Sequence, residues 1–220
     1  MSGDAIKLIL FFGLLGYLFW RNLPGALIFV RPAFIRCRIL GGAEAVEGAI
    51  RGPAMQEMTA EIEELGFEPL GLMVEQRPLR RGRRELVYGN PEARTFAVIA
   101  PVGNEAWLHY VTPFDGGATV ITADYHWPSI EEPDYLAGGL PAGSPLEILN
   151  THKRRVQRFV DEGRSVDGRY TLEARAEACG AFYAKGPGRR EVRRREVRGV
   201  MFTTAALIMV VLTVVDAARR

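Results

Sequence analysis

The chain ends in an uncharged stretch, Val200-Met-Phe-Thr-Thr-Ala-Ala-Leu-Ile-Met-Val-Val-Leu-Thr-Val-Val215, and this stretch sets the organisation of the whole sequence. With Gly199 before it, the stretch is just long enough for a helix rising 1.5 Å per residue to cross an oil layer roughly 30 Å thick. A helix satisfies its own backbone hydrogen bonds, which lipid cannot do for it. The sequence therefore predicts a C-terminal transmembrane helix over residues 199–217.

A second apolar segment lies near the N-terminus. It runs from Ala5 to Trp20, is interrupted by Arg21 and Pro24, and resumes over residues 25–30. No small-x-small cleavage site follows the first run, so we interpret it as a retained anchor rather than a signal peptide. The resumed run is expected to lie at the membrane interface or to re-enter the membrane.

Arginine residues lie on the inner side of both apolar segments, whereas the outer ends carry only Lys7, Arg219 and Arg220. The inner arginines are Arg21, Arg31, Arg36, Arg38, Arg189, Arg190, Arg193, Arg194, Arg195 and Arg198. Basic residues next to a transmembrane segment stay in the cytoplasm. The sequence thus predicts a central cytoplasmic domain on a bacterial inner membrane, with both termini outside.

The charge distribution argues against a role in nucleic-acid binding. The formal net charge is +2, but residues 39–185 hold 15 basic and 22 acidic side chains. Phosphate binding needs cations on the domain itself. Arginine outnumbers lysine 25 to 3, which indicates a GC-rich bacterial genome. Cys37 and Cys179 have no metal-binding spacing, and a disulfide between them is not expected on the cytoplasmic side of a membrane.

The central residues predict an α+β domain. Met55, Met58, Ile62 and Leu65 recur at helical spacing after Pro53. Strand-like runs follow over residues 70–76, 85–88, 95–100, 106–112 and 118–125, and the short turns between them permit only antiparallel neighbours. Ser144 and Glu147 form a capping box that opens a helix to about residue 162, and another helix covers 172–184.

We therefore predict a five-stranded antiparallel meander with about three helices on one sheet face, flanked by two transmembrane helices. The predicted parts are an N-terminal membrane anchor and basic flank (1–38), a cytoplasmic α+β domain (39–185), a basic juxtamembrane linker (186–198) and the C-terminal transmembrane helix (199–217).

Two groups of residues are candidates for a functional site. The first is the acidic run after the last predicted strand, which comprises Asp124, His126, Trp127, Glu131, Glu132 and Asp134, with His109 and His152 as residues that could join it in space. Carboxylates beside imidazoles can carry out acid–base chemistry, with Asp124, His126, Glu131 and His152 as the catalytic candidates. A solvated loop is the alternative. No metal-ligand spacing is present, so we predict no metal and no cofactor.

The second group consists of the arginines between the first two predicted strands, which are Arg77, Arg80, Arg81, Arg83 and Arg84. They could bind anionic lipid or an acidic partner, or form a solvated hairpin tip.

The leading hypothesis is a membrane-tethered domain that binds a protein partner or a small ligand at the inner membrane. One alternative is a membrane-associated enzyme acting on a small or lipid-linked substrate. The other is a structural accessory subunit of a membrane complex.

Overall fold

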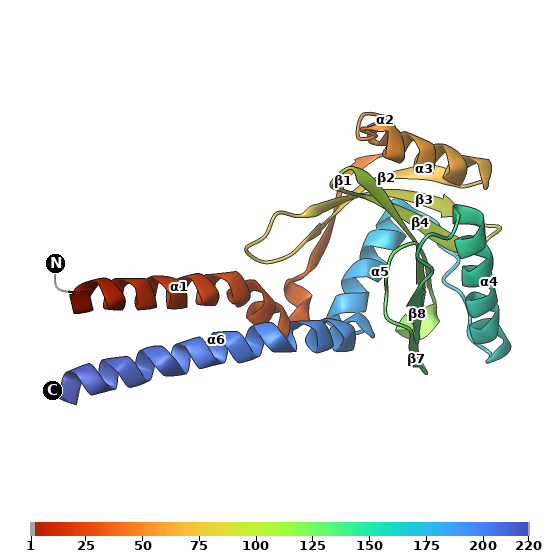
Figure 1. The fold of residues 1–220 in the computed structure, drawn as a ribbon. Helices are drawn as coiled ribbons and strands as arrows, with labels where there is room; N and C mark the ends of the chain where they lie inside the picture. Colours follow the sequence, from red (N-terminus) through yellow and green to blue (C-terminus); the bar gives the residue numbers. More distant parts are fainter. Residues whose placement is uncertain (1–2, 220) are drawn as a thin grey trace.

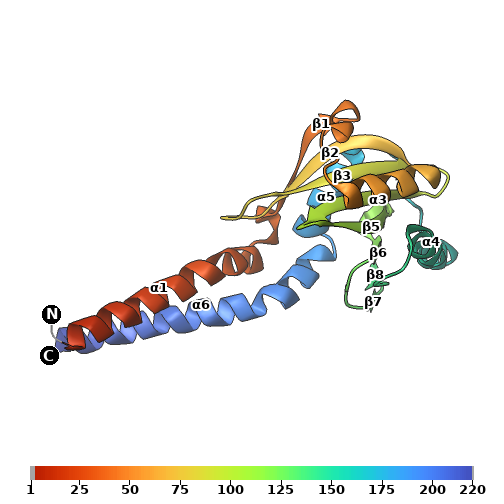
Figure 2. The same cartoon turned by 45° about the horizontal axis from the view of Figure 1, so that its top comes forward.

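Two long helices at the ends of the chain lie side by side and leave the folded domain on the same side (Figures 1 and 2). The computed structural model describes residues 3–219, so Arg220 lies outside it. The helices are α1 (Gly3–Val30) and α6 (Gly188–Arg219). Each contains a segment long and apolar enough to cross a membrane, Ile9–Val30 in α1 and Gly188–Asp216 in α6.

Both helices extend beyond the apolar runs recognised in the sequence. Residues 25–30 continue α1 as one helix with Pro24 inside it, rather than forming a separate interfacial stretch. The arginine-rich residues from Gly188 onward form the first turns of α6. Charged residues form a helix as readily as apolar ones, so hydropathy finds the lipid-facing part of a helix and misses its polar extension.

The domain contains one mixed sheet of eight strands among the described residues, in the order β1-β2-β3-β4-β5-β6-β8-β7. The strands are β1 (Arg36–Gly42), β2 (Glu68–Gln76), β3 (Arg83–Asn90), β4 (Thr95–Val102), β5 (Glu105–Pro113), β6 (Thr119–Ala123), β7 (Ile130–Glu132) and β8 (Tyr135–Gly139). The predicted five-stranded antiparallel meander corresponds to β2 through β6. The predicted strand count is wrong, because β1, β7 and β8 were not recognised.

The three missed strands lie at the two ends of the sheet. β1 begins in the basic segment assigned to the membrane flank, where Arg36 and Arg38 obscure the strand pattern, and it ends in the segment assigned to the domain. β7 and β8 fall in residues 127–143, a proline- and glycine-rich stretch that the sequence predicts to be a loop. β8 pairs with β6 in parallel, with Val120 opposite Leu136, so a hairpin-based prediction could not place it.

Helices cover both faces of the sheet, and the prediction that they share one face is wrong. On one face α3 (Pro53–Glu64) and α4 (Pro145–Asp161) pack on the sheet, with Ile62 and Ile148 against Tyr110. On the other face α5 (Leu172–Ala184) packs with Leu172 against Val87. Every residue of β4 from 95 to 100 is buried, as expected for a strand covered on both sides.

One local signal agrees with the sequence. Ser144 caps α4, because its side chain accepts a hydrogen bond from the backbone N–H of Glu147 while the Glu147 carboxylate accepts one from the backbone N–H of Ser144. A short additional helix, α2 (Glu44–Glu47), follows β1.

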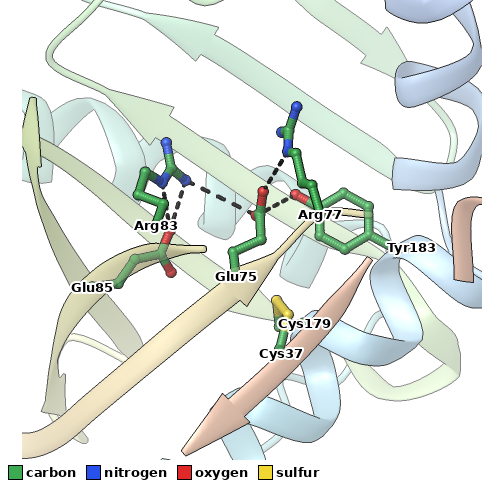
Figure 3. The surroundings of a disulfide bond; sticks show 7 residues. All are labelled: Cys37, Glu75, Arg77, Arg83, Glu85, Cys179 and Tyr183. Atoms are coloured by element: carbon green, nitrogen blue, oxygen red, sulfur yellow. Dashed lines mark hydrogen bonds and ion pairs between the residues drawn. A yellow bond between two sulfur atoms is a disulfide. The ribbon is translucent and has the colours of Figure 1, made fainter. Parts of the chain in front are cut away.

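A disulfide joins Cys37 in β1 to Cys179 in α5 (Figure 3). The Cα atoms lie 6.1 Å apart, and the two residues are 142 positions apart in sequence. The expectation of two separate thiols is therefore wrong. That expectation came from the reducing conditions of the cytoplasm. No sequence pattern showed that β1 pairs with β2 at the sheet edge beside α5, which brings the two cysteines together. The bond links the chain just after α1 to the chain just before α6.

Candidate functional site

Asp124 lies at the end of the strand pair β5–β6, where its carboxylate is bound to the backbone. Its Oδ2 accepts a hydrogen bond of 2.9 Å from the N–H of Leu108, and its Oδ1 is buried without a partner among the described residues. Burial raises the pKa of Asp124 to about 6. His126, two residues later, is exposed.

His152 lies inside the core and is surrounded by threonine hydroxyl groups. Its Nε2 lies 3.0 Å from the Thr95 Oγ1 and 2.9 Å from the Thr112 Oγ1, and its Nδ1 lies 3.1 Å from the Thr122 Oγ1. Burial lowers the pKa of His152 to about 3, so the ring is neutral. His152 belongs to α4 and points from it onto the sheet, whereas His109 lies on the opposite face of the sheet against α5. The structure thus does not bring His152 together with the acidic run.

The remaining acidic candidates form ion pairs with arginines on two helices. Glu131 lies 3.0 Å from Arg158 of α4. Glu132 lies 2.7 Å from both Arg190 and Arg194 of α6, and Asp134 also pairs with Arg190. The β7–β8 edge therefore docks onto the first turns of α6, and these carboxylates neutralise part of the basic run that precedes the apolar segment.

The arginines between β2 and β3 divide into two sets. Arg77 and Arg83 are partly buried and point toward carboxylates, whereas Arg80, Arg81 and Arg84 are exposed. The loop that carries Arg80 and Arg81 projects from the domain on the side from which α1 and α6 leave it (Figures 1 and 2).

A buried network of charges occupies the space between the sheet and α5, next to the disulfide. Figure 3 shows Arg77 and Arg83 on either side of Glu75, with the Tyr183 hydroxyl also bound to it. Arg77 Nε and the Tyr183 hydroxyl donate to Glu75 at 3.0 and 2.7 Å. Arg83 donates to Glu85 through Nε at 3.0 Å and through Nη2 at 2.6 Å. Glu75 and Glu85 are both buried.

Burial and the neighbouring arginines shift the pKa values of Glu75 and Glu85 in opposite directions. Burial acts to raise the pKa of Glu75, but Arg77 and Arg83 together hold it below its usual value. Burial raises the pKa of Glu85 above its usual value although Arg83 opposes this change. Burial also lowers the pKa of the nearby His109 ring well below its usual value, which keeps it neutral. The network therefore contains one ionised carboxylate, one carboxyl with a tendency to hold its proton, and a neutral imidazole.

A cavity of about 50 Å³ lies beside this network. Glu75, Arg83, Glu85, His109 and Arg175 form its polar wall, and Trp127 closes it from the loop after β6. Arg175 is 7% exposed, and its Nε has no hydrogen-bond partner among the described residues. The indole Nε1 of Trp127 is likewise buried and unpaired. An unpaired buried donor costs roughly 1–3 kcal/mol, so both groups call for an acceptor that the protein does not supply.

A wider pocket of about 340 Å³ adjoins the cavity at the base of α6. The two spaces share the side chains of Arg83, Trp127, Phe182 and Tyr183. Arg195 of α6 lies over the Trp127 ring at 4.8 Å from its centroid, and the exposed His126 lies on the outer wall. The wide pocket therefore lies next to the inner cavity, beside the first turns of α6.

Sequence reasoning recognised Trp127 and His109 but missed Glu75, Glu85 and Arg175. A usable signal was present in the helical spacing, because Arg175 falls three residues after Leu172 and four before Cys179 on the inward face of α5. A charged residue at a core position needs a partner or a ligand. The arrangement around it can bind a small polar molecule.

Among residues 3–219, no group of three or more His, Cys, Asp or Glu side chains is arranged to hold a metal.

Comparison of the chain with protein-family models, with curated proteins and with solved structures finds no match. The functional interpretation therefore depends on the geometry of the molecule itself.

Proposed function

We propose that this chain is a membrane-tethered domain that binds a protein partner or a small ligand at the cytoplasmic face of a bacterial inner membrane. The observation that carries the proposal is the pair of long helices, which leave the domain together with their apolar side chains uncovered. Leu10 and Met201 are 67% and 66% exposed, for example. An apolar surface of this extent on a soluble protein would promote aggregation, whereas lipid covers it.

Alkaline extraction of membranes tests the attachment. The full-length chain is expected to remain in the membrane pellet at high pH and to be released only by detergent. Release by alkali alone would contradict the proposal, because a peripheral domain held by charge loses its attachment under those conditions.

Two features bear on which side of the membrane the domain faces. The arginines flanking both apolar segments favour the cytoplasm. The Cys37–Cys179 disulfide favours an oxidising compartment, because cytosolic thiols are kept reduced. We propose the cytoplasmic side, since ten inner arginines contrast with three basic residues at the outer ends.

Protease protection decides between the two sides. The domain is expected to resist protease added to spheroplasts and to be cleaved in inverted vesicles. Thiol trapping in intact cells provides an independent readout. Cleavage in spheroplasts together with a fully oxidised cysteine pair would overturn the orientation.

The exposed arginines of the β2–β3 loop support contact with anionic lipid. Arg80 and Arg81 lie on the side of the domain from which α1 and α6 emerge, so the tethers hold them close to the head groups. A basic side chain near an anionic surface contributes about 1 kcal/mol. Replacing both arginines by serine is expected to reduce the phosphatidylglycerol that co-purifies in mild detergent. The matched control replaces Lys153 and Arg154 on α4, which lies on the far side of the domain (Figure 1).

Cross-linked purification of the full-length chain, followed by mass spectrometry, tests for a protein partner. A stoichiometric membrane or cytoplasmic protein would support the binding role, and its loss on domain variants would separate an adaptor from a structural accessory subunit.

The enzymatic alternative requires His126 or His152 beside a carboxylate, and it gains no support from the threonine environment of His152.

A further inference from the structure

Two buried hydrogen-bond donors belong to residues that line the inner cavity between the sheet and α5, and neither has an acceptor among the described residues. Arg175 Nε and Trp127 Nε1 come from different parts of the fold, α5 and the loop after β6, and both residues line the same space. Arg175 is more than nine-tenths buried and carries a permanent charge. The chain thus contains a cation held away from water with part of its hydrogen-bonding capacity unused.

The carboxylates of the cavity wall do not use that capacity. Glu75 is already bound by Arg77 and Tyr183, and Glu85 is bound twice by Arg83. His109, which also lines the cavity, carries no charge at neutral pH because burial keeps it neutral. A ligand that accepts hydrogen bonds would therefore satisfy both donors, and a negatively charged acceptor matches the guanidinium of Arg175 best.

The size of the cavity limits what can fill it. One water needs roughly 10–15 Å³ on the same measure, so 50 Å³ holds a few waters or an anion of a few non-hydrogen atoms. The lining also includes apolar side chains, among them Val111, Ile121 and Phe182. A small carboxylate, with two acceptor oxygens and at most a short apolar group, matches this mixed lining.

We infer that this cavity is a binding site for a small carboxylate of about formate to propionate size, held by Arg175 and Trp127. The inference deepens the small-ligand part of the proposed function, but it depends on the folded domain alone. The ligand reaches the cavity through the wider pocket at the base of α6, past the shared side chains of Arg83 and Tyr183.

The test is calorimetric titration of the full-length chain in detergent with sodium formate, acetate and propionate at constant ionic strength, with chloride as the reference anion. We expect saturable binding of at least one carboxylate at one site, with chloride binding at least tenfold weaker. Absence of saturable carboxylate binding would overturn the inference. Equal binding of chloride would overturn the assignment to carboxylates.

Three variants test the location of the site. Arg175→Met and Trp127→Phe each remove one donor and are expected to weaken binding at least tenfold. Ala178→Leu keeps both donors but fills the cavity, since Ala178 lines it, and is expected to abolish binding. It therefore keeps the test decisive if Arg175→Met fails to fold. Arg154→Met is the matched control on an exposed face of α4 and should bind as the parent does.

Wild-type affinity in Ala178→Leu would place the bound anion elsewhere and overturn the inference. The result is distinguishable from the membrane proposal. If alkali releases a chain that still binds carboxylate, only the proposed membrane attachment is contradicted. If the chain stays in the membrane but binds no carboxylate, only the proposed binding site is contradicted.

Discussion

At the scale of single residues, several of the charged and polar groups inside this domain are held by specific partners rather than by solvent. Asp124 and His152 illustrate two different solutions. Asp124 keeps one oxygen on a backbone N–H and leaves the other buried, whereas three threonine hydroxyls surround the His152 ring. The buried Asp124 carboxyl makes the stability of the fold depend on pH. The His152 ring lies among three buried threonine hydroxyls, so the stability of the core depends on this imidazole.

Asp124→Asn should remove a pH dependence of stability. Burial raises the folded pKa of Asp124 from 3.8 to about 6, so proton binding favours the folded state. Stability from this group is therefore present at low pH and is lost as the pH rises from about 4 through 6. Allowing for its partial exposure, the loss is about 1 kcal/mol. Asn keeps the acceptor for Leu108 and carries no charge, so the variant should be more stable than the parent at pH 7.

Denaturant unfolding of the full chain at pH 4.5, 5.5 and 7 measures this difference. Asp115→Asn, at an exposed position, is the matched control and should leave the slope unchanged. An unaltered pH slope in Asp124→Asn would show that the charge of Asp124 does not affect folding.

His152→Ala should destabilise the fold by about 3 kcal/mol, whereas His126→Ala should change stability by less than about 0.5 kcal/mol. The first change leaves a void and removes the partner of buried threonine hydroxyls, and the second removes an exposed ring. Thermal unfolding monitored by circular dichroism compares the two variants. Parental stability in His152→Ala would contradict a structural role, and a loss of function without a loss of stability would then favour the enzymatic alternative.

At the scale of elements, the sequence predicted best where neighbours in the chain are also neighbours in space. The strands β2 to β6 follow one another through short turns, and the helix that begins after Ser144 is defined by its own capping box. These features depend on spacing over a few residues. The sequence could not predict pairings across long separations, such as the parallel pairing of β8 with β6 or the docking of Glu132 on α6.

The candidate site was predicted only in part for the same reason. Trp127 was predicted as part of the acidic run, and His109 as an imidazole that could join it in space. Arg175, which lines the same cavity, comes from a helix some fifty residues beyond Trp127. The loop arginines were recognised as a group, and their division into inward and outward sets depends on the register that places Glu75 opposite Arg83. No local pattern contains that register.

A glycine, Gly199, lies at the contact between α1 and α6. A Cβ atom at Gly199 would lie 3.5 Å from the Asn22 carbonyl oxygen and 3.7 Å from the Gly25 Cα atom. A leucine there would push its larger side chain against the backbone of α1, so Gly199→Leu is expected to separate the helices. The matched control is Gly16→Leu, because a Cβ atom at Gly16 meets nothing within 4 Å.

Electron spin resonance distances between labels at Ile6 and Val214, in a background without the native cysteines, measure the separation. The distribution should broaden or lengthen in Gly199→Leu and stay as in the parent in Gly16→Leu. An unchanged distribution in Gly199→Leu would mean that the helices are held together from the domain alone.

At the scale of the whole molecule, the disulfide lies close to the two points at which α1 and α6 join the domain. Cys37 follows α1 closely and Cys179 precedes α6, so the bond fixes the two points at which the domain joins its tethers. Ion pairs from Arg190 to Glu132 and from Arg77 to Glu196 connect the sheet to the first turns of α6. The domain therefore has several attachments to α6 beyond the single backbone connection.

Reduction of the disulfide should lower the stability of the domain substantially. Closing a loop of 142 residues restricts the unfolded chain by about 5 kcal/mol on the chain-entropy estimate. Denaturant unfolding with and without reductant measures the effect, and Cys37→Ser should match the reduced parent. Reductant should have no effect on Cys37→Ser. An unchanged midpoint for the reduced parent would show that the bond does not constrain the unfolded chain.

The disulfide also makes a covalent ring of residues 37–179, with one membrane helix on each side of it. A single backbone cut inside that ring, for example in the exposed β2–β3 loop, yields two pieces that remain joined through sulfur. On a non-reducing gel the cut protein would migrate near its full mass of 24.4 kDa, and only reduction would reveal the fragments. A nicked domain would keep both long helices in one molecule, and with them the membrane attachment proposed above.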